Sequence, residues 1–252
     1  MPLMALTASD WALTGAAALG AGALNAVAGG GSFLTFPALV FTGVPPVAAN
    51  ATSAVAVAPG YLASALAFRP ELQALPRPRL LREALICALG GLIGAGLLLV
   101  TPARLFNSVV PWLLLLATTL FALGPWLARQ RTSEPHALAR TLGLLAVAVY
   151  GGYFNGGLGI LLMALYTLTG EPRVHTANAM KNLNSLVLSL LSVAAFAWAG
   201  AVVWPQALWM AALATLGGYL GGRLARRLPA AAVRAGVIAT GAVMTVVFFA
   251  RG

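Results

Sequence analysis

Long stretches without charge leave few folds open to this sequence. Only 8% of its 252 residues are charged, against about 25% in soluble domains, so most of its surface must face lipid. A helix crosses a bilayer with about 20 apolar residues, and several of the uncharged stretches hold one span or more. The sequence therefore predicts an all-α polytopic membrane protein. The uncharged stretches are 11–68, 84–103, 105–128, 141–170, 182–222 and 235–250.

The composition also argues against several classes of function. A single cysteine, Cys87, excludes an internal disulfide and a thiolate-rich metal site. No G-x-x-x-x-G-K-[ST] or H-E-x-x-H pattern occurs, so no cofactor and no metal are expected. An intramembrane enzyme using Ser32 or Ser53 with His175 would lack the acid that orients the histidine. We therefore expect a protein that is not an enzyme.

The net charge of +10 comes from arginines in short connections between the apolar stretches. That distribution is typical of cytoplasmic loops of membrane proteins. The sequence therefore predicts the lipid bilayer as a partner and no nucleic acid.

An internal repeat divides the chain into two halves. Three pairs of segments match: "GVPPVAANAT" (43–52) with "GEPRVHTANAM" (170–180), "LGGLIGAGLLLVTPA" (89–103) with "LGGYLGGRLARRLPA" (216–230), and "NAVAGGGSFLTFP" (25–37) with "GGYFNGGLGILLM" (151–163). We expect a first transmembrane repeat at 1–128 and a second at 129–252. Each repeat would hold a glycine-broken helix followed by three further helices.

About eight membrane segments follow from this division, and proline marks most of their connections. The expected segments are 11–28 plus 32–42, 47–68, 83–101 and 106–128, then 138–154 plus 158–169, 174–198, 204–223 and 230–250.

The positions of the arginines favour one topology over another. If both broken segments cross the membrane, the loops divide the arginines 8 to 6 between the two faces. If each broken segment is a hairpin that returns to its own side, 12 share one face and only Arg104 and Arg251 lie on the other. Because basic loops gather in the cytoplasm, the hairpin is favoured. Three true crossings per half then make the two repeats inverted, with both termini outside the cytoplasm.

The two glycine breaks are candidate parts of a binding site. An interrupted helix leaves N–H groups that lipid cannot satisfy but a bound anion can. The alternative for glycine in a membrane helix is close packing of helices, and this alternative is favoured for "GGLIGAG" and "GGYLGG". The candidate residues at the breaks are Gly30, Gly31, Ser32, Asn155, Gly156 and Gly157.

Lys181 is the only lysine, and it lies within the predicted helix 174–198. A charge within a span is costly and commonly functional, and no acidic residue of the same helix neutralises it. Lys181 is therefore a predicted anion ligand, with snorkelling of its flexible stem toward water as the alternative. No acidic residue is expected deep within a span, so a carboxylate proton carrier is not predicted.

Polar neighbours complete the predicted substrate site. Asn178, Asn182 and Ser185 share a helical face beside Lys181. The matching stretch of the first repeat adds Asn50, Thr52 and Ser53. The alternative role for these side chains is hydrogen bonding between helices.

These segments resemble the TauE/SafE family of sulfite and organosulfonate exporters. The resemblance rests on "AGGGSFLTFPALVFTGVPPVAANATSAVAVAPGYLASAL" (28–66) and "GGYFNGGLGILLMALYTLTGEPRVHTANAMKNLNSLV" (151–187). The second element of the family commonly ends in a lysine, which here would be Lys181. The break "NGGLG" is less glycine-rich than is usual in the family.

The resemblance implies export of a small anion, such as sulfite or a short sulfonate, through an eight-segment fold of two repeats. We therefore expect a secondary transporter that works by alternating access in a bacterial inner membrane. An anion channel and a non-transporting membrane subunit are the alternatives, and the sequence leaves a homodimer open.

Overall fold

The computed structural model describes residues 7–27, 30–129, 137–171, 173–224 and 230–251. These residues form eleven α-helices and no strand, which confirms the all-helical prediction. The helices are α1 (Ala8–Val27), α2 (Ser32–Phe41), α3 (Pro46–Ala67), α4 (Arg69–Gln73), α5 (Arg77–Val100), α6 (Ala103–Arg129), α7 (Ala137–Tyr153), α8 (Leu158–Leu168), α9 (Val174–Trp198), α10 (Trp204–Leu224) and α11 (Ala230–Arg251).

Two elements differ from the sequence prediction. The short helix α4 was not expected, and α5 begins at Arg77 instead of residue 83. The predicted start was placed where the charged residues end. The helix begins earlier, among the arginines, because Pro78 lies in its first turn, where the backbone N–H that proline lacks would have no partner within the helix. Glu83 therefore lies within a helix, with consequences for the site described below.

Three helices of the described part are long and apolar enough to cross a bilayer, judged by length and composition: Arg77–Val100, Ala103–Leu123 and Val174–Trp198. Shorter apolar helices cover Ser32–Phe41, Leu138–Tyr153, Leu158–Leu168 and Ile238–Ala250. The helices thus support a polytopic membrane protein, while the expected number of about eight segments stays a prediction.

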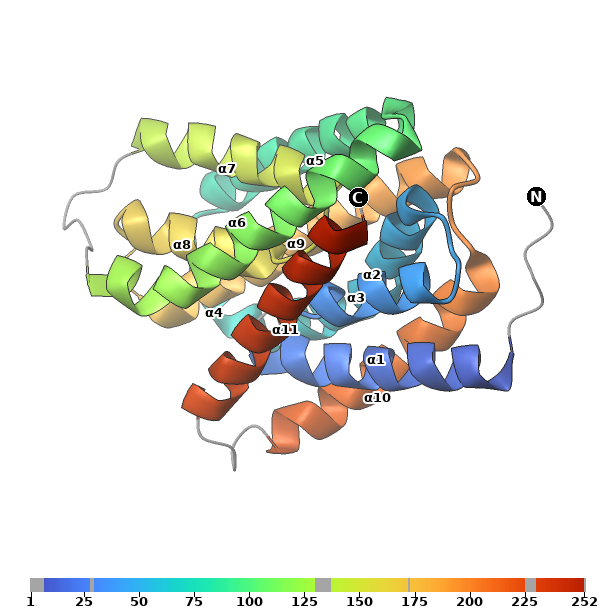
Figure 1. Ribbon diagram of the computed structural model, residues 1–252. Coiled ribbons are helices and arrows are strands. Elements are labelled where there is room, and N and C mark those ends of the chain that lie inside the picture. The colour runs from blue at the N-terminus through green and yellow to red at the C-terminus, as the bar shows by residue number, and fades with distance from the viewer. Residues whose placement is uncertain (1–6, 28–29, 130–136, 172, 225–229, 252) are drawn as a thin grey trace.

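Six helices pack side by side in the order α1, α10, α3, α9, α5, α7. Figure 1 shows the two ends of this row on opposite sides of the molecule, with α5 beside α7 and α1 beside α10. The broken arms α2 and α8 pack against α3 and α9 respectively. Helices α6 and α11 pack together across the front of the view in Figure 1, and they contact α8 and α2.

Glycine brings the helices at both ends of the row into backbone contact. A Cβ atom at Gly94 of α5 would overlap the carbonyl oxygen of Val149 in α7. A Cβ atom at Gly217 of α10 would likewise overlap the carbonyl oxygen of Leu19 in α1. Close helix packing is therefore confirmed for Gly94 of "GGLIGAG" and Gly217 of "GGYLGG".

This contact yields a paired test on α5. We expect Gly94→Ala to lower the melting temperature of the purified protein in detergent, because overpacking costs about 1–3 kcal/mol. Gly96→Ala is the matched control, since a Cβ atom at Gly96 would meet nothing within 4 Å. The better helix propensity of alanine should leave that variant as stable as the parent or slightly more stable. Equal melting temperatures for the two variants would contradict the packing role.

Candidate functional site

The two glycine breaks, far apart in the sequence, lie against each other. Ser32 begins α2, and its hydroxyl donates to both the backbone oxygen and the side-chain Oδ1 of Asn155, each at 3.3 Å. Asn155 lies between α7 and α8. The breaks of the first and second halves of the chain therefore meet at one buried position.

Three carbonyl groups at the end of α7 and just after it receive side-chain donors. The Asn50 amide donates to the Tyr153 carbonyl at 3.1 Å, Ser32 reaches the Asn155 carbonyl, and the Tyr150 hydroxyl donates to the Gly156 carbonyl at 2.7 Å. The last carbonyls of a helix have no partner within the helix, and lipid offers none. Asn50 thus satisfies the last carbonyl of α7, while Ser32 adds a second donor to the Asn155 carbonyl, which also accepts the N–H of Leu158 at 3.3 Å.

Glycine is required at this break by conformation and by space. Gly157 has a φ of 75°, in the left-handed region. A Cβ atom there would lie 2.7 Å from Ala117 and 3.1 Å from the Phe33 ring. At the first break, a Cβ atom on Gly31 would lie 2.7 Å from the Ala21 carbonyl oxygen. The close approach of neighbouring elements therefore depends on glycine at both breaks.

Gly30 and Gly156, the other predicted glycines of the breaks, are also buried. The Gly30 carbonyl accepts the N–H of Phe33 at 3.1 Å and so starts the first turn of α2. Residues 28 and 29, which belong to the predicted glycine run, lie outside the described residues.

Asn155 keeps an unused hydrogen-bond donor at the meeting point. Its Oδ1 accepts from Ser32 and from the Tyr61 hydroxyl, the latter at 3.1 Å. Its Nδ2 is buried and has no partner among the described residues. A buried unpaired donor costs about 1–3 kcal/mol, and an acceptor on a bound ligand would remove that cost. Tyr61, on α3, was not among the residues predicted from the sequence.

Thr52 and Ser53 hold helices together in this structure. The Thr52 hydroxyl accepts the backbone N–H of Val203 at 3.0 Å, just before α10. The hydroxyl groups of Ser53 and Thr35 lie 2.6 Å apart and join α3 to α2. The alternative role of hydrogen bonding between helices therefore applies to these two residues as the structure stands.

Lys181 lies on α9 with 8% of its surface exposed. None of the acidic residues in the described part forms an ion pair with it. Of its predicted companions, Asn182 and Ser185 are buried and Asn178 is half-buried. The Ser185 Oγ has no hydrogen-bond partner among the described residues. Lys181 is therefore buried and has no carboxylate partner among the described residues.

The structure thus brings some of the predicted site residues together and leaves others apart. Ser32 and Asn155 are in contact, and Asn50 reaches the residue two positions before Asn155. Within the described residues, no hydrogen bond or ion pair joins Lys181 to this group, although α9 packs against both α3 and α8. Their joint role in one substrate site stays a prediction.

Helix α5 holds a buried carboxylate that the sequence placed at a helix boundary. Glu83 is 5% exposed, and its Oε2 accepts from the Tyr166 hydroxyl at 2.6 Å and from the Asn184 amide at 3.4 Å. The same amide donates to the Tyr166 oxygen at 2.6 Å. Glu83 lies in the second turn of α5, and the expectation that no acid lies deep within a span stays a prediction.

Arginines join this carboxylate to a second one. Arg79 donates through Nε to Glu83 at 3.1 Å and through Nη2 to Glu171 at 2.6 Å. Arg140 of α7 lies 3.8 Å from Glu171 and also donates to the Thr169 carbonyl at 2.9 Å. The only local sequence signal for this network is the spacing of four residues between Arg79 and Glu83. Its long-range members had no such signal.

Comparison with known proteins gives the family. The family model described as "Sulfite exporter TauE/SafE" matches residues 14–248. The chain belongs to the TauE/SafE family.

Curated relatives of this TauE/SafE chain cover most of its length. A "Probable membrane transporter protein" of Haemophilus influenzae is 29% identical over 205 residues, which are 80% of this chain and 79% of that protein. The "Probable membrane transporter protein YfcA" of Escherichia coli K12 is 28% identical over 236 residues, 89% of this chain and 84% of that protein. The "Probable membrane transporter protein ORF9" of a Sinorhizobium species is 27% identical over 212 residues, 83% and 80% of the two chains. No solved structure matches the chain.

The hydrogen bonds around Glu83 give a testable coupling. We expect Tyr166→Phe to destabilise the protein by about 1–3 kcal/mol, because it removes a donor to a buried carboxylate and an acceptor of the Asn184 amide. Thermal unfolding in detergent measures the effect. A double-mutant cycle with Asn184→Ala provides the control, since residues in one network are not additive. Simple additivity of the two changes would show that the network does not act as a unit.

Proposed function

We propose that this chain is a secondary membrane transporter that exports a small oxyanion, such as sulfite or a short organosulfonate, by alternating access. The observation that carries the proposal is the buried Lys181 ammonium, which has no acidic partner among the described residues. Membership of a family described as sulfite exporters supports it, as do the names of the relatives, which are probable membrane transporter proteins.

The energetic argument starts from the cost of a lone buried charge. Moving an ammonium group out of water costs several kcal/mol even after relaxation, and no carboxylate of the described residues offsets that cost. A bound anion would offset it and would leave again when the site opens to water. By contrast, Glu83 and Glu171 pair with Arg79, and Glu171 also lies near Arg140, so neither carboxylate pairs with Lys181.

Neutral donors around Lys181 suit the three oxygens of a sulfite or sulfonate group. Alignment of Asn50 with Asn178 places Ser53 at the position equivalent to Lys181. Since Ser53 lies against the broken arm α2, we infer that Lys181 is directed toward the other broken arm, α8. The proposed ligands there are Asn178, Asn182, Ser185 and the unpaired Nδ2 of Asn155.

We infer that the two halves, 1–128 and 129–252, are related by a pseudo-twofold axis. The counterparts in the two halves are α1 and α7, α3 and α9, and α5 and α10. When each helix is exchanged for its counterpart, the order α1, α10, α3, α9, α5, α7 becomes the same order read backwards. The contacts of α2 with α11 and of α8 with α6 exchange in the same way. Binding between two such repeats is a recurrent transporter design.

Directions of the helices support inversion of the repeats. Contacts of Trp11 with Trp209 and of Gly22 with Gly218 make α1 and α10 parallel. Helices α5 and α7 are parallel as well. Arg82 contacts Thr141 near the starts of both helices, and Gly94 contacts Val149 further along both.

The short connection 199–203 turns the chain from α9 back into α10. Helix α9 is parallel to α5, because Asn184 contacts Glu83 and Ser192 contacts Gly91. Since α10 runs opposite to α9, the pair α1 and α10 runs opposite to the pair α5 and α7. The first helices of the two halves then point in opposite directions, as an inverted repeat requires.

The same contacts favour a hairpin at each break. The turn 42–45 joins α2 to the start of α3, and the Thr52 bond to Val203 keeps that start beside the start of α10. Since α1 begins at the same end, the pair α1 and α2 would enter and leave on one side of the membrane. The arginines at the starts of α5 and α7 would lie on the other side, which we take as cytoplasmic, in a bacterial inner membrane.

Cavities at the two ends of the molecule fit a carrier with two access routes. One, of about 320 Å³, lies between the starts of α5 and α7. The other, of about 810 Å³, is lined by residues at the end of α2 and the start of α6, including Arg104. Export of a monovalent anion from a negative-inside cell gains about 2.3 kcal/mol per 100 mV, so it needs no coupled ion.

The first test of the proposal replaces the lysine. We expect Lys181→Met to abolish saturable sulfite efflux from proteoliposomes, because the only charge at the site is lost. The size-exclusion profile should stay that of the parent, and the melting temperature should be no lower, because the substitution removes a buried unpaired charge. Lys181→Arg should retain part of the activity. Unchanged efflux kinetics in Lys181→Met would exclude Lys181 from the site. Non-saturable flux without counterflow in the parent would favour the channel alternative.

The second test addresses the inverted topology. In a Cys87→Ala background, we expect Ala199→Cys to react with a membrane-impermeant maleimide added outside intact cells, whereas Gln73→Cys should not. Both positions are exposed at the ends of helices, so access to the reagent decides the outcome. After permeabilisation both should react, which controls for the reactivity of each thiol. Labelling of Gln73→Cys alone in intact cells would reverse the proposed orientation.

A further inference from the structure

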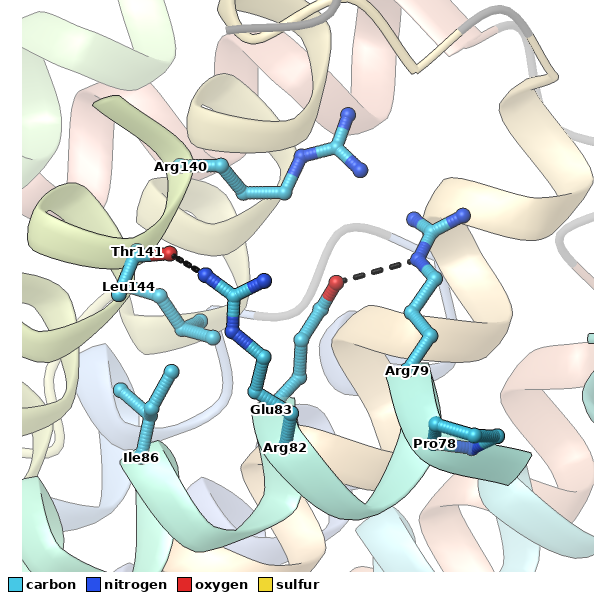
Figure 2. A pocket seen from close by; sticks show the side chains of 8 residues that line it. All are labelled: Pro78, Arg79, Arg82, Glu83, Ile86, Arg140, Thr141 and Leu144. Carbon is cyan, nitrogen blue, oxygen red and sulfur yellow. Dashed lines mark hydrogen bonds and ion pairs between the residues drawn. The ribbon is translucent and has the colours of Figure 1, made fainter. Parts of the chain in front are cut away.

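A cavity with charge of its own lies between the starts of α5 and α7, and Lys181 is not among the residues that line it. It has a volume of about 320 Å³, within the range of small-molecule sites. Figure 2 shows Arg79, Arg82 and Arg140 around it, with Glu83 between the first two. Three cationic side chains at one small cavity repel one another unless anions compensate them.

The two glutamates of the network compensate only part of this charge. The Arg79 guanidinium forms ion pairs with both Glu83 and Glu171. Arg140 is held by the hydroxyl and the carbonyl of Thr169 and lies near Glu171. Three arginines against two carboxylates leave a net charge of +1 at the cavity.

Arg82 carries the charge that is left over. Its Nη2 donates to the Thr141 hydroxyl, which is a neutral partner. No carboxylate of the described residues forms an ion pair with it. A guanidinium has five N–H donors in a fork that matches an oxyanion, so most donors of Arg82 remain available. The Glu83 oxygens do not oppose a bound anion strongly, because Arg79, Tyr166 and Asn184 already donate to them.

The remaining wall of the cavity is apolar. Pro78, Ile86 and Leu144 line it beside the arginines, and Figure 2 shows Ile86 and Leu144 on the side of Arg82. An oxyanion group bound at Arg82 could therefore place an attached carbon chain against this wall. The combination selects an oxyanion with an apolar substituent over an inorganic oxyanion.

We propose that this cavity is a second binding site, for an oxyanion group on an apolar stem, with Arg82 as its main ligand. The site is separate from Lys181 and does not require that Lys181 bind the substrate. A soluble organosulfonate and the headgroup of an anionic phospholipid share this chemistry, so the experiment must separate them. Basic pockets between membrane helices are known to bind lipid headgroups.

Calorimetric titration of the full chain with 1-propanesulfonate in phosphatidylcholine nanodiscs tests the proposal. The Lys181→Met background removes the proposed substrate site, and we expect one saturable site per chain to remain. Adding Arg82→Gln should weaken binding by about tenfold or more, since hydrogen bonds to charged groups are worth about 1.5–3 kcal/mol. Arg77→Gln, which removes an exposed arginine from the same helix, should leave the affinity unchanged. Methanesulfonate should bind severalfold more weakly than propanesulfonate, because it covers less of the apolar wall.

A second variant guards against misfolding of Arg82→Gln. Thr141→Val keeps the shape of its side chain, removes the hydroxyl that holds Arg82, and should weaken binding severalfold. Including phosphatidylglycerol in the nanodiscs identifies the source of the ligand. If the lipid headgroup occupies the site, phosphatidylglycerol should lower the affinity for propanesulfonate in the protein that keeps Arg82, but not in Arg82→Gln. If the ligand is a soluble anion, phosphatidylglycerol should leave the affinity of both proteins unchanged.

Loss of all binding in Lys181→Met, or equal affinity with and without Arg82, would overturn the proposal. Neither binding result tests the transport proposal, because that proposal is tested by measuring sulfite efflux in the single variant Lys181→Met.

Discussion

A helix that stops inside a membrane leaves backbone groups that lipid cannot hydrogen-bond, and the architecture of this protein follows from that constraint. At the break after α7, Asn50 donates to the last carbonyl group of the helix, and Ser32 and Tyr150 donate to the carbonyl groups of Asn155 and Gly156. Two of these donors come from the first half of the chain, so each half would be incomplete without the other. The six packed helices and the crossing pair α6 and α11 enclose the breaks. Backbone contact through glycine at α1–α10 and α5–α7 keeps that enclosure tight.

The acidic side chains and Lys181 have different electrostatic environments. Glu83 and Glu171 pair with arginines near the starts of α5 and α7. Lys181 is buried and has no such partner in the described residues. A buried ion pair is compensated, whereas a lone ammonium group favours any anion that reaches it. The proposed anion transport rests on this difference.

The sequence predicted the helices well because hydrophobic length and proline position are local properties. Helix α9 has the predicted bounds of 174–198, and α10 and α11 each end one residue beyond theirs. The start of α5 was predicted six residues late, since charge alone does not end a helix and Pro78 fits its first turn. Glu83 was therefore read as a boundary residue. Its partners Tyr166 and Asn184 lie 83 and 101 residues further along the chain, and no local pattern joins them.

By itself, the sequence determined that the chain is helical and suited to a membrane, and that Lys181 is a lone charge in an apolar helix; it also predicts that the two halves share one architecture. Each of these follows from composition or spacing along the chain. Only the tertiary structure decided which polar groups are used up and which stay available. It paired Thr52 and Ser53 with other helices, left Nδ2 of Asn155 without a partner among the described residues, and built the cavity at Arg82. Hydrogen bonds across 100 residues depend on how helices pack, and packing is a property of the whole chain.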